Sequence, residues 1–325
     1  MPATSVARTS KRCLPRRTRW RTGGSHGANA APSSAHSNVD PGSLAENALG
    51  RLGNPYPRGD VRYERTFDEM VADVNAVTLE KVRDFHGRFY GATRGEFAAV
   101  GDMDVAQVRA ALQAALGDWR GGVAYTRVPQ PLVPQQPQRL VLSTPDKQNA
   151  TMLVRLPVPL SDHDADYPAL SMANYLLGLG GNSRLWKRIR ETEGLSYDVN
   201  TRVSWNSHEA NSIWMASAIF APQNAAKVEK AFREELERAL REGFSAKELA
   251  EGQRGLLNFR RLSRAQDGSI ATLLANNLNL DRSFAYSGRI DAELGRLTVA
   301  QVNAALRKYL KPDSLVIVLA GDFKP

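Results

Sequence analysis

The chain has 325 residues, of which 42% are apolar and 24% are charged, the composition of a protein that buries ordinary cores. Its formal charge of +9 is uneven: seven basic side chains and no acid lie before residue 40, which leaves 36 basic and 34 acidic side chains in the rest. A near-neutral body without a basic cluster argues against a nucleic-acid partner, because a phosphate-binding surface needs basic groups gathered on one folded face.

The first segment, residues 1–40, is rich in Arg, Ser, Ala and Gly and has no apolar periodicity, so we expect a disordered basic tail. Residues 1–39 contain no acid, a composition that is typical of an organelle transit peptide, and this alternative leaves the compartment open. No clear secretory signal is present, and no apolar run approaches the ~18 to 20 residues of a membrane helix. Cys13 stands alone, which excludes an internal disulfide and argues against a cysteine metal site.

A long internal repeat organises the chain. Residues 70–78 align without a gap on residues 290–298, at an offset of 220, and share the pattern apolar-x-x-acid-apolar-x-x-apolar-Thr. The register continues downstream to a Gly-Asp pair in both copies. Each copy therefore predicts a helix capped by its threonine, Thr78 or Thr298, followed by a short apolar strand that ends in a Gly-Asp turn.

The residues between the two repeat segments predict a second domain after a proline-rich linker, 126–138. Alternating apolar runs indicate strands, and 3.6-residue periodicity indicates helices. We expect an α+β domain with a mostly antiparallel sheet and helices on one face. The expected strands are 139–143, 151–158, 197–206 and 212–221; the expected helices are 167–177, 184–191 and 223–242, with a stop at Gly243 and a capping box at Ser245 and Glu248.

The repeat also predicts that the first copy is incomplete. Counting 220 residues back from residue 139 gives a point about 80 residues before Met1. We therefore expect residues 41–125 to be the C-terminal part of a first domain and residues 139–325 to be the full second domain.

The segment 179–197 carries a two-part motif. It reads Gly180-Gly181-x-Ser183-Arg184-Leu185 and then Arg190-Glu191-x-x-Gly194-Leu195-x-Tyr197. This motif resembles the signature of the C-terminal domain of the M16 metallopeptidases, the family of insulinase, pitrilysin and the mitochondrial processing peptidases. The resemblance implies duplicated α+β domains over residues 41–325, the first copy incomplete.

The resemblance implies roles for the motif residues. Arg190 and Tyr197 would bind the substrate, while Gly180, Gly181, Ser183 and Arg184 would form a substrate loop. A guanidinium and a phenol both donate hydrogen bonds, so the pair could hold a peptide carbonyl and stabilise an oxyanion. The residues alone leave another interpretation open, in which Arg190 forms a surface ion pair with a neighbouring Glu and Tyr197 packs at a strand start. A phosphate loop is disfavoured, because no Gly-Lys-Ser/Thr is present.

The metal-binding motif of the family is missing. Active M16 members carry His-x-x-Glu-His, in which two histidines bind zinc and the Glu is the general base. No two of the five histidines lie four residues apart, and the corresponding helix of the second copy offers Asn174 and Tyr175. We expect no cofactor in this chain, and zinc only in a complete or partner domain. His163 and the aspartates beside it are expected in a solvated loop, and His208 in a hairpin turn.

The resemblance, together with the missing metal motif, implies a zinc-metallopeptidase-like protein, the peptide-binding half of a clamshell peptidase that is inactive alone. Its expected partners are a peptide or unfolded protein substrate and an M16 subunit that carries His-x-x-Glu-His. The alternative is a non-catalytic structural or interaction subunit on the same fold. A third possibility is a fragment whose incomplete first domain exposes its core.

Overall fold

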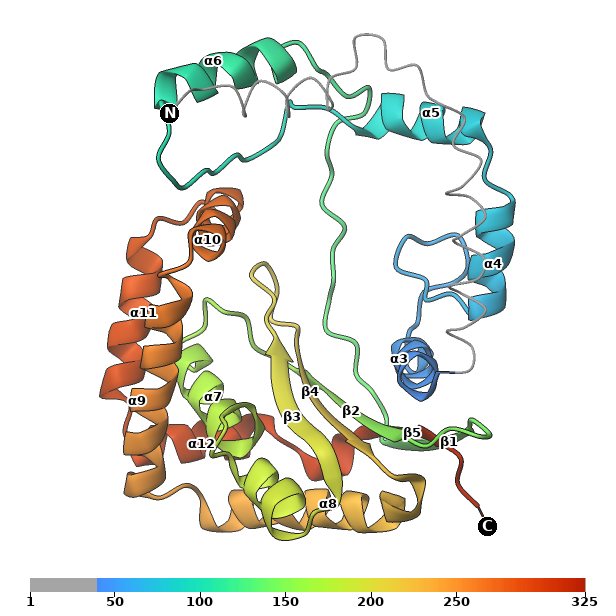
Figure 1. Cartoon of the computed structure of the whole chain (residues 1–325), viewed down its shortest axis with the longest axis vertical. Helices are drawn as coiled ribbons and strands as arrows, with labels where there is room; N and C mark the ends of the chain where they lie inside the picture. The colour runs from blue at the N-terminus through green and yellow to red at the C-terminus, as the bar shows by residue number, and fades with distance from the viewer. Residues whose placement is uncertain (1–39, 325) are drawn as a thin grey trace. The chain divides into compact units, whose positions relative to one another are not determined.

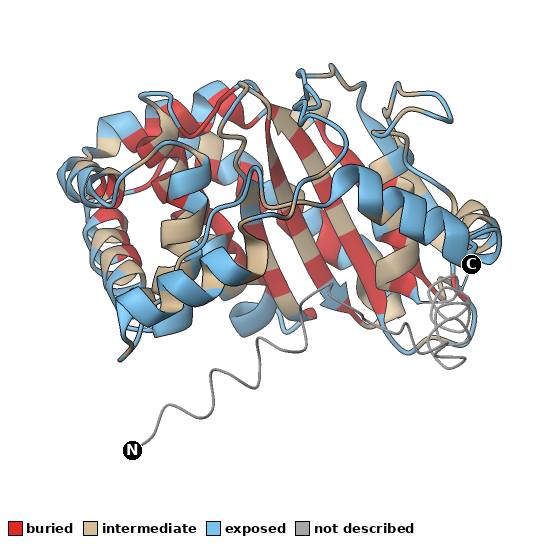
Figure 2. Cartoon of the chain, turned by 90° about the horizontal axis from the view of Figure 1, so that it is seen from above, coloured by how far each residue is buried: buried red, intermediate tan, exposed pale blue. Residues whose placement is uncertain are grey.

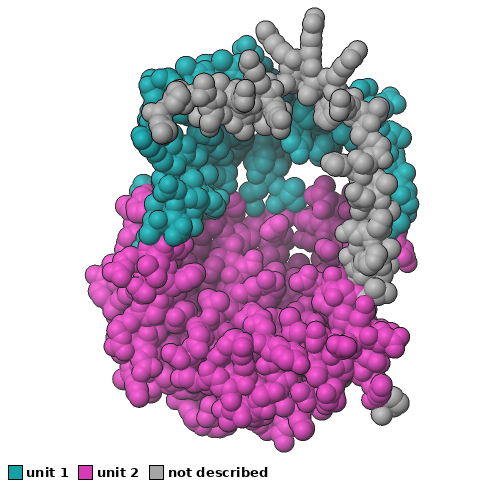
Figure 3. Space-filling view, in the orientation of Figure 1, with its two compact units in different colours: residues 1–33, 71–128, 264–283 teal, residues 34–70, 129–263, 284–325 magenta. Residues whose placement is uncertain are grey.

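The computed structural model describes residues 40–324, so the predicted tail lies outside the described residues. These residues divide into two compact units (Figure 3). Unit 1 contains residues 71–128 and 264–283, and unit 2 contains residues 40–70, 129–263 and 284–324. In the described part of the chain no helix is long and apolar enough to cross a membrane.

Unit 2 is built on a five-stranded sheet of mixed direction (Figure 1). The strand order is β1-β5-β2-β4-β3, with β1 parallel to β5 and the other pairs antiparallel. This confirms the expected α+β class with a mostly antiparallel sheet. The strands are β1 (Gln138–Ser143), β2 (Ala150–Val158), β3 (Ser196–Ser204), β4 (Ser212–Phe220) and β5 (Val316–Gly321).

The main core lies between one face of this sheet and a layer of helices. Alternate residues of β2 and β4 are buried on that face, as the banding of the strands in Figure 2 shows. Trp214 of β4 is fully buried and its ring lies 6.4 Å from that of Phe232 on α8. The helices of unit 2 on or beside this core are α7 (Tyr167–Asn174), α8 (Ala225–Glu242), α9 (Ala246–Ser263), α11 (Ala285–Arg296) and α12 (Val299–Tyr309).

The turn from α8 to α9 shows why the sequence stops one helix and starts the next. Gly243 has a φ of 75°, and a Cβ there would lie 2.5 Å from the Asn303 side chain, so only glycine fits. Asn303 in turn exchanges two hydrogen bonds with the backbone of Phe244. Ser245 and Glu248 form the predicted capping box at the start of α9. The junction is thereby fixed to α12.

The second face of the sheet is partly covered by α3 (Pro41–Arg51). Asp40 caps this helix, and its buried residues Ala45 and Leu49 pack against Val316 and Val318 of β5. The sequence predicted helices on one face of this sheet only, because residues 41–51 were assigned to the first domain. The structure adds this helix on the opposite face.

The predicted helices around the motif contain π-helical turns. The helix expected at 167–177 is α7 followed by a π-helix, η1 (Tyr175–Leu179), and the one expected at 184–191 becomes η2 (Trp186–Thr192). The Gly180 amide donates to the Tyr175 carbonyl at 2.8 Å, and the Glu193 amide to the Arg188 carbonyl at 3.0 Å, both five residues back. Such turns insert a residue into the helix, which no pattern of period 3.6 reveals.

Unit 1 holds little buried surface. It contains α5 (Leu79–Phe89), α6 (Val105–Leu116) and α10 (Asp267–Asn279), and α4 (Phe67–Asn75) crosses its boundary. No residue of α4, α5 or α6 is buried. Thr78 caps α5 as predicted, but the strand expected before Gly101 does not form. Its counterpart β5 is held between β1 and β2, and the described residues of unit 1 contain no strand that could pair in this way.

Candidate substrate-binding site

The first glycine of the motif is required by close packing. A Cβ on Gly180 would lie 2.9 Å from the Tyr175 ring, so a larger residue would push the turn away from η1. Gly181 has open space around its Cα position, and its backbone has no positive φ. The two glycines of the predicted substrate loop therefore differ: the first fixes the turn and the second leaves room beside it.

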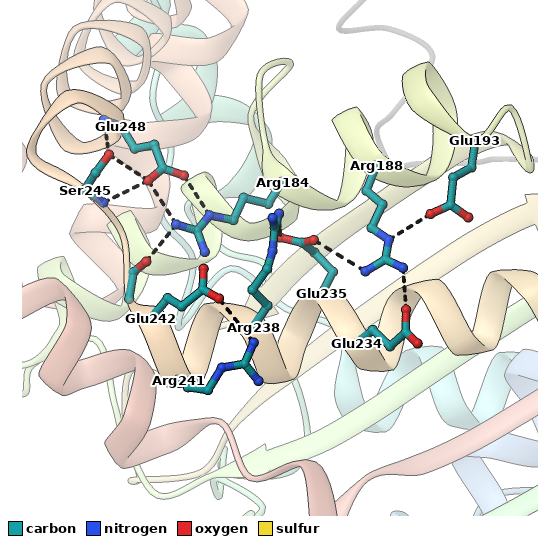
Figure 4. Close-up of polar contacts among 11 residues, drawn as sticks. Arg184, Arg188, Glu193, Glu234, Glu235, Arg238, Arg241, Glu242, Ser245 and Glu248 are labelled. Atoms are coloured by element: carbon teal, nitrogen blue, oxygen red, sulfur yellow. Dashed lines mark hydrogen bonds and ion pairs between the residues drawn. The ribbon is translucent and has the colours of Figure 1, made fainter.

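Ser183 and Arg184 face the protein. Ser183 is 2% exposed, and its amide closes the turn by donating to the Gly180 carbonyl at 2.9 Å. Arg184 donates to both carboxylate oxygens of Glu248, at 2.7 and 2.9 Å, and to the Gly243 carbonyl at 2.7 Å (Figure 4). These contacts anchor the loop to the α8–α9 junction. The geometry favours a supporting role for these two residues over direct contact with a substrate.

The Arg184–Glu248 pair is half-buried, and its electrostatics follow from that position. Burial opposes the charge of Glu248, but the hydrogen bonds from Arg184 and from Ser245 outweigh it and hold the pKa of Glu248 at about 2. Burial likewise acts against the charge of Arg184, yet Glu248 keeps its pKa above the usual value. Both groups are therefore charged at neutral pH.

A second charged cluster, which the sequence analysis missed, ties η2 to α8. Arg188 donates to Glu193 at 2.9 Å and also pairs with Glu234 (Figure 4). Glu235 is fully buried, 3.9 Å from Arg188, and accepts from Arg238 at 2.7 Å. The sequence does show a Glu-Glu pair, Glu234 and Glu235, on the polar edge of α8. Their partner Arg188 lies 46 residues before Glu234, so no local pattern connects them.

The predicted binding pair does come together. Between η2 and β3 the chain reverses at Gly194, whose φ is 61°, and the Leu195 amide donates to the Ile189 carbonyl at 2.9 Å. This turn brings the Arg190 guanidinium to the backbone carbonyl of Tyr197, where Nη1 donates at 2.8 Å. The Tyr197 side chain is 67% exposed.

Arg190 is held from a second side. Its guanidinium lies over the Trp186 ring, with Cζ 4.2 Å from the centroid. The alternative of an ion pair with a neighbouring Glu is not what this structure shows: within residues 40–324, Arg190 contacts Trp186 and the Tyr197 carbonyl. A guanidinium has five N–H donors, so this arrangement leaves others for a ligand.

Asn174, one of the two residues at the expected position of the metal helix, binds a protein group. Within the described residues no group of three His, Cys, Asp or Glu could hold a metal ion. Asn174 is buried and its Oδ1 accepts from the Trp214 indole at 3.0 Å. Next to it, burial raises the pKa of Tyr175.

The loop around His163 differs from its prediction. Asp162 is buried and accepts from the Ser207 hydroxyl at 2.7 Å, and Asp166 accepts from Lys308 at 2.7 Å. The prediction of a solvated loop is therefore wrong for Asp162, because the β3–β4 hairpin folds back over it. His208 lies in that hairpin turn, as predicted.

The chain is similar to known proteins in sequence and in structure. Residues 76–256 match the family described as "Peptidase M16 inactive domain". An uncharacterized zinc protease of Streptomyces coelicolor is 30% identical over 203 residues, 59% of this chain and 42% of that protein. The non-peptidase homolog YmxG of Helicobacter pylori is 21% identical over 253 residues, 77% of this chain and 57% of that protein. This chain thus spans less than two thirds of the length of these relatives.

A solved structure shows the same fold. The peptidase M16 inactive domain from Pseudomonas fluorescens superposes with a TM-score of 0.71 at 23% identity, over 100% of this chain and 72% of that one. At this level of identity the likeness supports the architecture of the chain.

Proposed function

Because the chain belongs to the peptidase M16 inactive-domain family, we propose that it is the peptide-binding half of a two-part zinc peptidase. In this proposal the chain grips a peptide or an unfolded protein, and a separate domain or subunit with His-x-x-Glu-His supplies zinc. The proline-rich segment 126–138 would be the boundary between residues 41–125, which correspond to the C-terminal part of the repeat, and the binding domain, 139–325. The chain alone would not cleave peptides.

The observation that carries this proposal is the exposed Arg190–Tyr197 pair. The guanidinium is oriented by two contacts, to the Tyr197 carbonyl and to the Trp186 ring, and the phenol of Tyr197 projects from the start of β3. A donor that is already oriented loses less entropy when it binds a carbonyl oxygen. The loop that supports the pair is fixed by the Arg184–Glu248 bonds.

The chemistry we assign to this chain is binding and orientation. Arg190 and Tyr197 would donate hydrogen bonds to a peptide carbonyl, and these bonds would strengthen as negative charge develops on its oxygen during attack. The residues at the position of the family's zinc helix, Asn174 and Tyr175, do not fit a zinc site: the Asn174 side chain is bonded to Trp214. No step of hydrolysis is therefore assigned to a metal in this chain.

The test mixes this chain with an M16 subunit that carries His-x-x-Glu-His and measures cleavage of an unfolded protein. Removing one oriented donor to an oxyanion costs on the order of 10² in rate, so Arg190→Ala should lower kcat/KM to this extent. Arg254→Gln removes the same charge from an exposed position of α9 and should change nothing. Unchanged activity in Arg190→Ala, with the fold intact by circular dichroism, would show that the assigned role is wrong.

A second candidate is a non-catalytic interaction subunit on the same fold. It is favoured by the relative from Helicobacter pylori that is described as a non-peptidase homolog. This candidate predicts a stable complex with an M16 partner and no dependence of peptidase activity on Arg190 or Tyr197. Co-purification of the mixture followed by the same cleavage assay separates the two functions.

A further inference from the structure

The second face of the sheet carries two arginines in one row. Arg155 of β2 and Arg202 of β3 both pair in register with Met215 of β4, which lies between them. Residues directly opposite each other in antiparallel strands project to the same face, and each strand is ~4.8 Å from the next. The two arginine side chains therefore project from the same side of the sheet. Their Cα atoms are separated by roughly 10 Å, two strand spacings, with Met215 between them.

A cavity of about 480 Å³ lies over this row, within unit 2. Its floor is the sheet, with Arg155, Arg202 and Met215, and its wall is α3 and the segment after it, with Leu49 and Glu64. This volume is in the range of small-ligand pockets in proteins, ~300–1,000 Å³. The cavity can hold one amino-acid side chain with part of its backbone.

Neither guanidinium is satisfied by the protein around it. Arg155 donates through Nη1 to the Leu49 carbonyl at 3.3 Å, while its Nε is buried without a hydrogen-bond partner among the described residues. The contact of Arg202 is to the sulfur of Met215 at 3.7 Å, a weak acceptor. In the described chain neither arginine forms an ion pair with a carboxylate, whereas Arg184 and Arg188 of the same unit do.

Two further observations bear on the charge of the cavity. Burial lowers the pKa of Arg155, which means that its cation is held without full compensation; Glu64 partly opposes this effect. Glu46 and Glu64 also line the cavity, but both belong to the α3 side, whereas the arginines belong to the sheet. The charge of Glu64 opposes the effect of burial on Arg155, and in the described chain Glu64 forms no ion pair with it.

We propose that this cavity is a carboxylate-binding subsite, in which Arg155 and Arg202 receive the side chain of an acidic residue of a bound peptide. A carboxylate has two oxygens with about four acceptor positions, so two guanidiniums can bind it together. Asn200 and Ser217, which share a row of the sheet beside the arginines, offer donors for the backbone of the same residue. That the ligand is a peptide rests on the proposed peptide-binding function. That the cavity prefers a carboxylate rests on the residues of the cavity alone.

The subsite is tested with acetyl-glutamate amide and acetyl-glutamine amide, which carry almost no peptide chain for Arg190 and Tyr197 to grip. Nuclear magnetic resonance titration should show the glutamate compound shifting the Nε–Hε signals of Arg155 and Arg202 and the Met215 methyl. The glutamine compound should bind at least roughly tenfold more weakly, because its bonds to arginine are not charge-assisted. Equal shifts from both compounds, or none from either, would overturn the proposal.

Variants separate this subsite from the Arg190–Tyr197 pair. Arg202→Gln, at an exposed position, should abolish the preference for glutamate, and Arg155→Met should do the same if it folds. Glu64→Gln should increase affinity severalfold, because it removes a competing carboxylate. Arg190→Ala and the control Arg254→Gln should leave the preference unchanged. A glutamate preference that survives Arg202→Gln refutes the subsite whatever the outcome of the peptidase assay.

Discussion

The two copies of the internal repeat have the same sequence pattern and opposite surroundings. In α12 the repeat positions Val302 and Tyr309 are 0% and 6% exposed, because the helix packs on α7. In α5 the matching positions Val82 and Phe89 are 41% and 49% exposed. A capped helix with an apolar face is therefore specified locally, but its burial depends on a partner helix. Among the described residues α12 has such a partner in α7, whereas α5 has no buried residue.

The largest effect is expected from a matched pair of truncations. Tyr309→Ala removes a buried ring and its hydrogen bond to Asp166, so the free energy of unfolding of unit 2 should fall by about 3–5 kcal/mol. Phe89→Ala at the matching position should change stability by about 0.5 kcal/mol or less, as exposed positions do. Urea denaturation followed by tryptophan fluorescence measures both. Similar losses from the two changes would mean that α5 packs in solution as α12 does.

The second prediction concerns the ion pair that fixes the motif loop within unit 2. Glu248→Gln should destabilise unit 2 by about 1–3 kcal/mol, because it leaves the half-buried Arg184 without its anion. The pKa of Glu248 is about 2 in the folded state and 4.5 ordinarily, so the pair stabilises the fold above pH 4.5 and this stability is lost as the pH falls toward 2.

Unfolding free energies between pH 2 and pH 7 check this dependence. In Glu248→Gln the unfolding free energy should fall less steeply as the pH is lowered from 4.5 to 2, and we call this fall the acid limb. Glu242→Gln makes the same charge change at a more exposed site and should leave the acid limb unchanged. An acid limb that is identical in the wild type and in Glu248→Gln would contradict the assignment.

The smallest effect is expected at the two threonine caps. Thr298→Ala removes a capping box and should cost unit 2 about 1 kcal/mol. Thr78→Ala removes a similar bond, to the Lys81 amide at 3.2 Å, but from a helix with no buried face. Its effect should be faster amide hydrogen exchange in α5, with no change in the unfolding of unit 2.

The serine variants serve as controls for the caps, because serine retains the hydroxyl that accepts the bond. Thr298→Ser and Thr78→Ser should behave like the wild type. A loss of unit 2 stability in Thr78→Ala would show that α5 contributes to that unit and would weaken the contrast between the copies.

Much of the fold was predictable because its signals are local. The strands at β2 and β4, the helix α8 with its stop at Gly243 and the capping box at Ser245 follow from periodicity and from residues within a few positions of each other. The strand before Gly101 was wrongly predicted for the converse reason. An apolar run becomes a strand only when neighbouring strands satisfy its backbone, and that requirement cannot be read from the run itself.

For the site, the motif named Arg190 and Tyr197, and the structure brings the Arg190 guanidinium to the Tyr197 carbonyl; their substrate-binding role stays a prediction. The positions of the other motif residues needed the tertiary structure. Ser183 and Arg184 lie in the same stretch of letters, yet they point into the protein. The pairing of Arg188 with Glu234 joins residues that no local pattern connects. Whether a polar residue of a motif faces a ligand or a neighbouring helix is decided by packing.

The sequence by itself determined the repeat, the helix caps, the α+β class and the absence of paired histidines four residues apart, because each of these is a matter of spacing along the chain. Only the tertiary structure decided that α3 covers part of the second sheet face, that Arg190 lies on Trp186, and that Arg155 and Arg202 share one row. These features arise from strand register and from the packing of distant segments, in which the free energy of a contact depends on which surfaces meet.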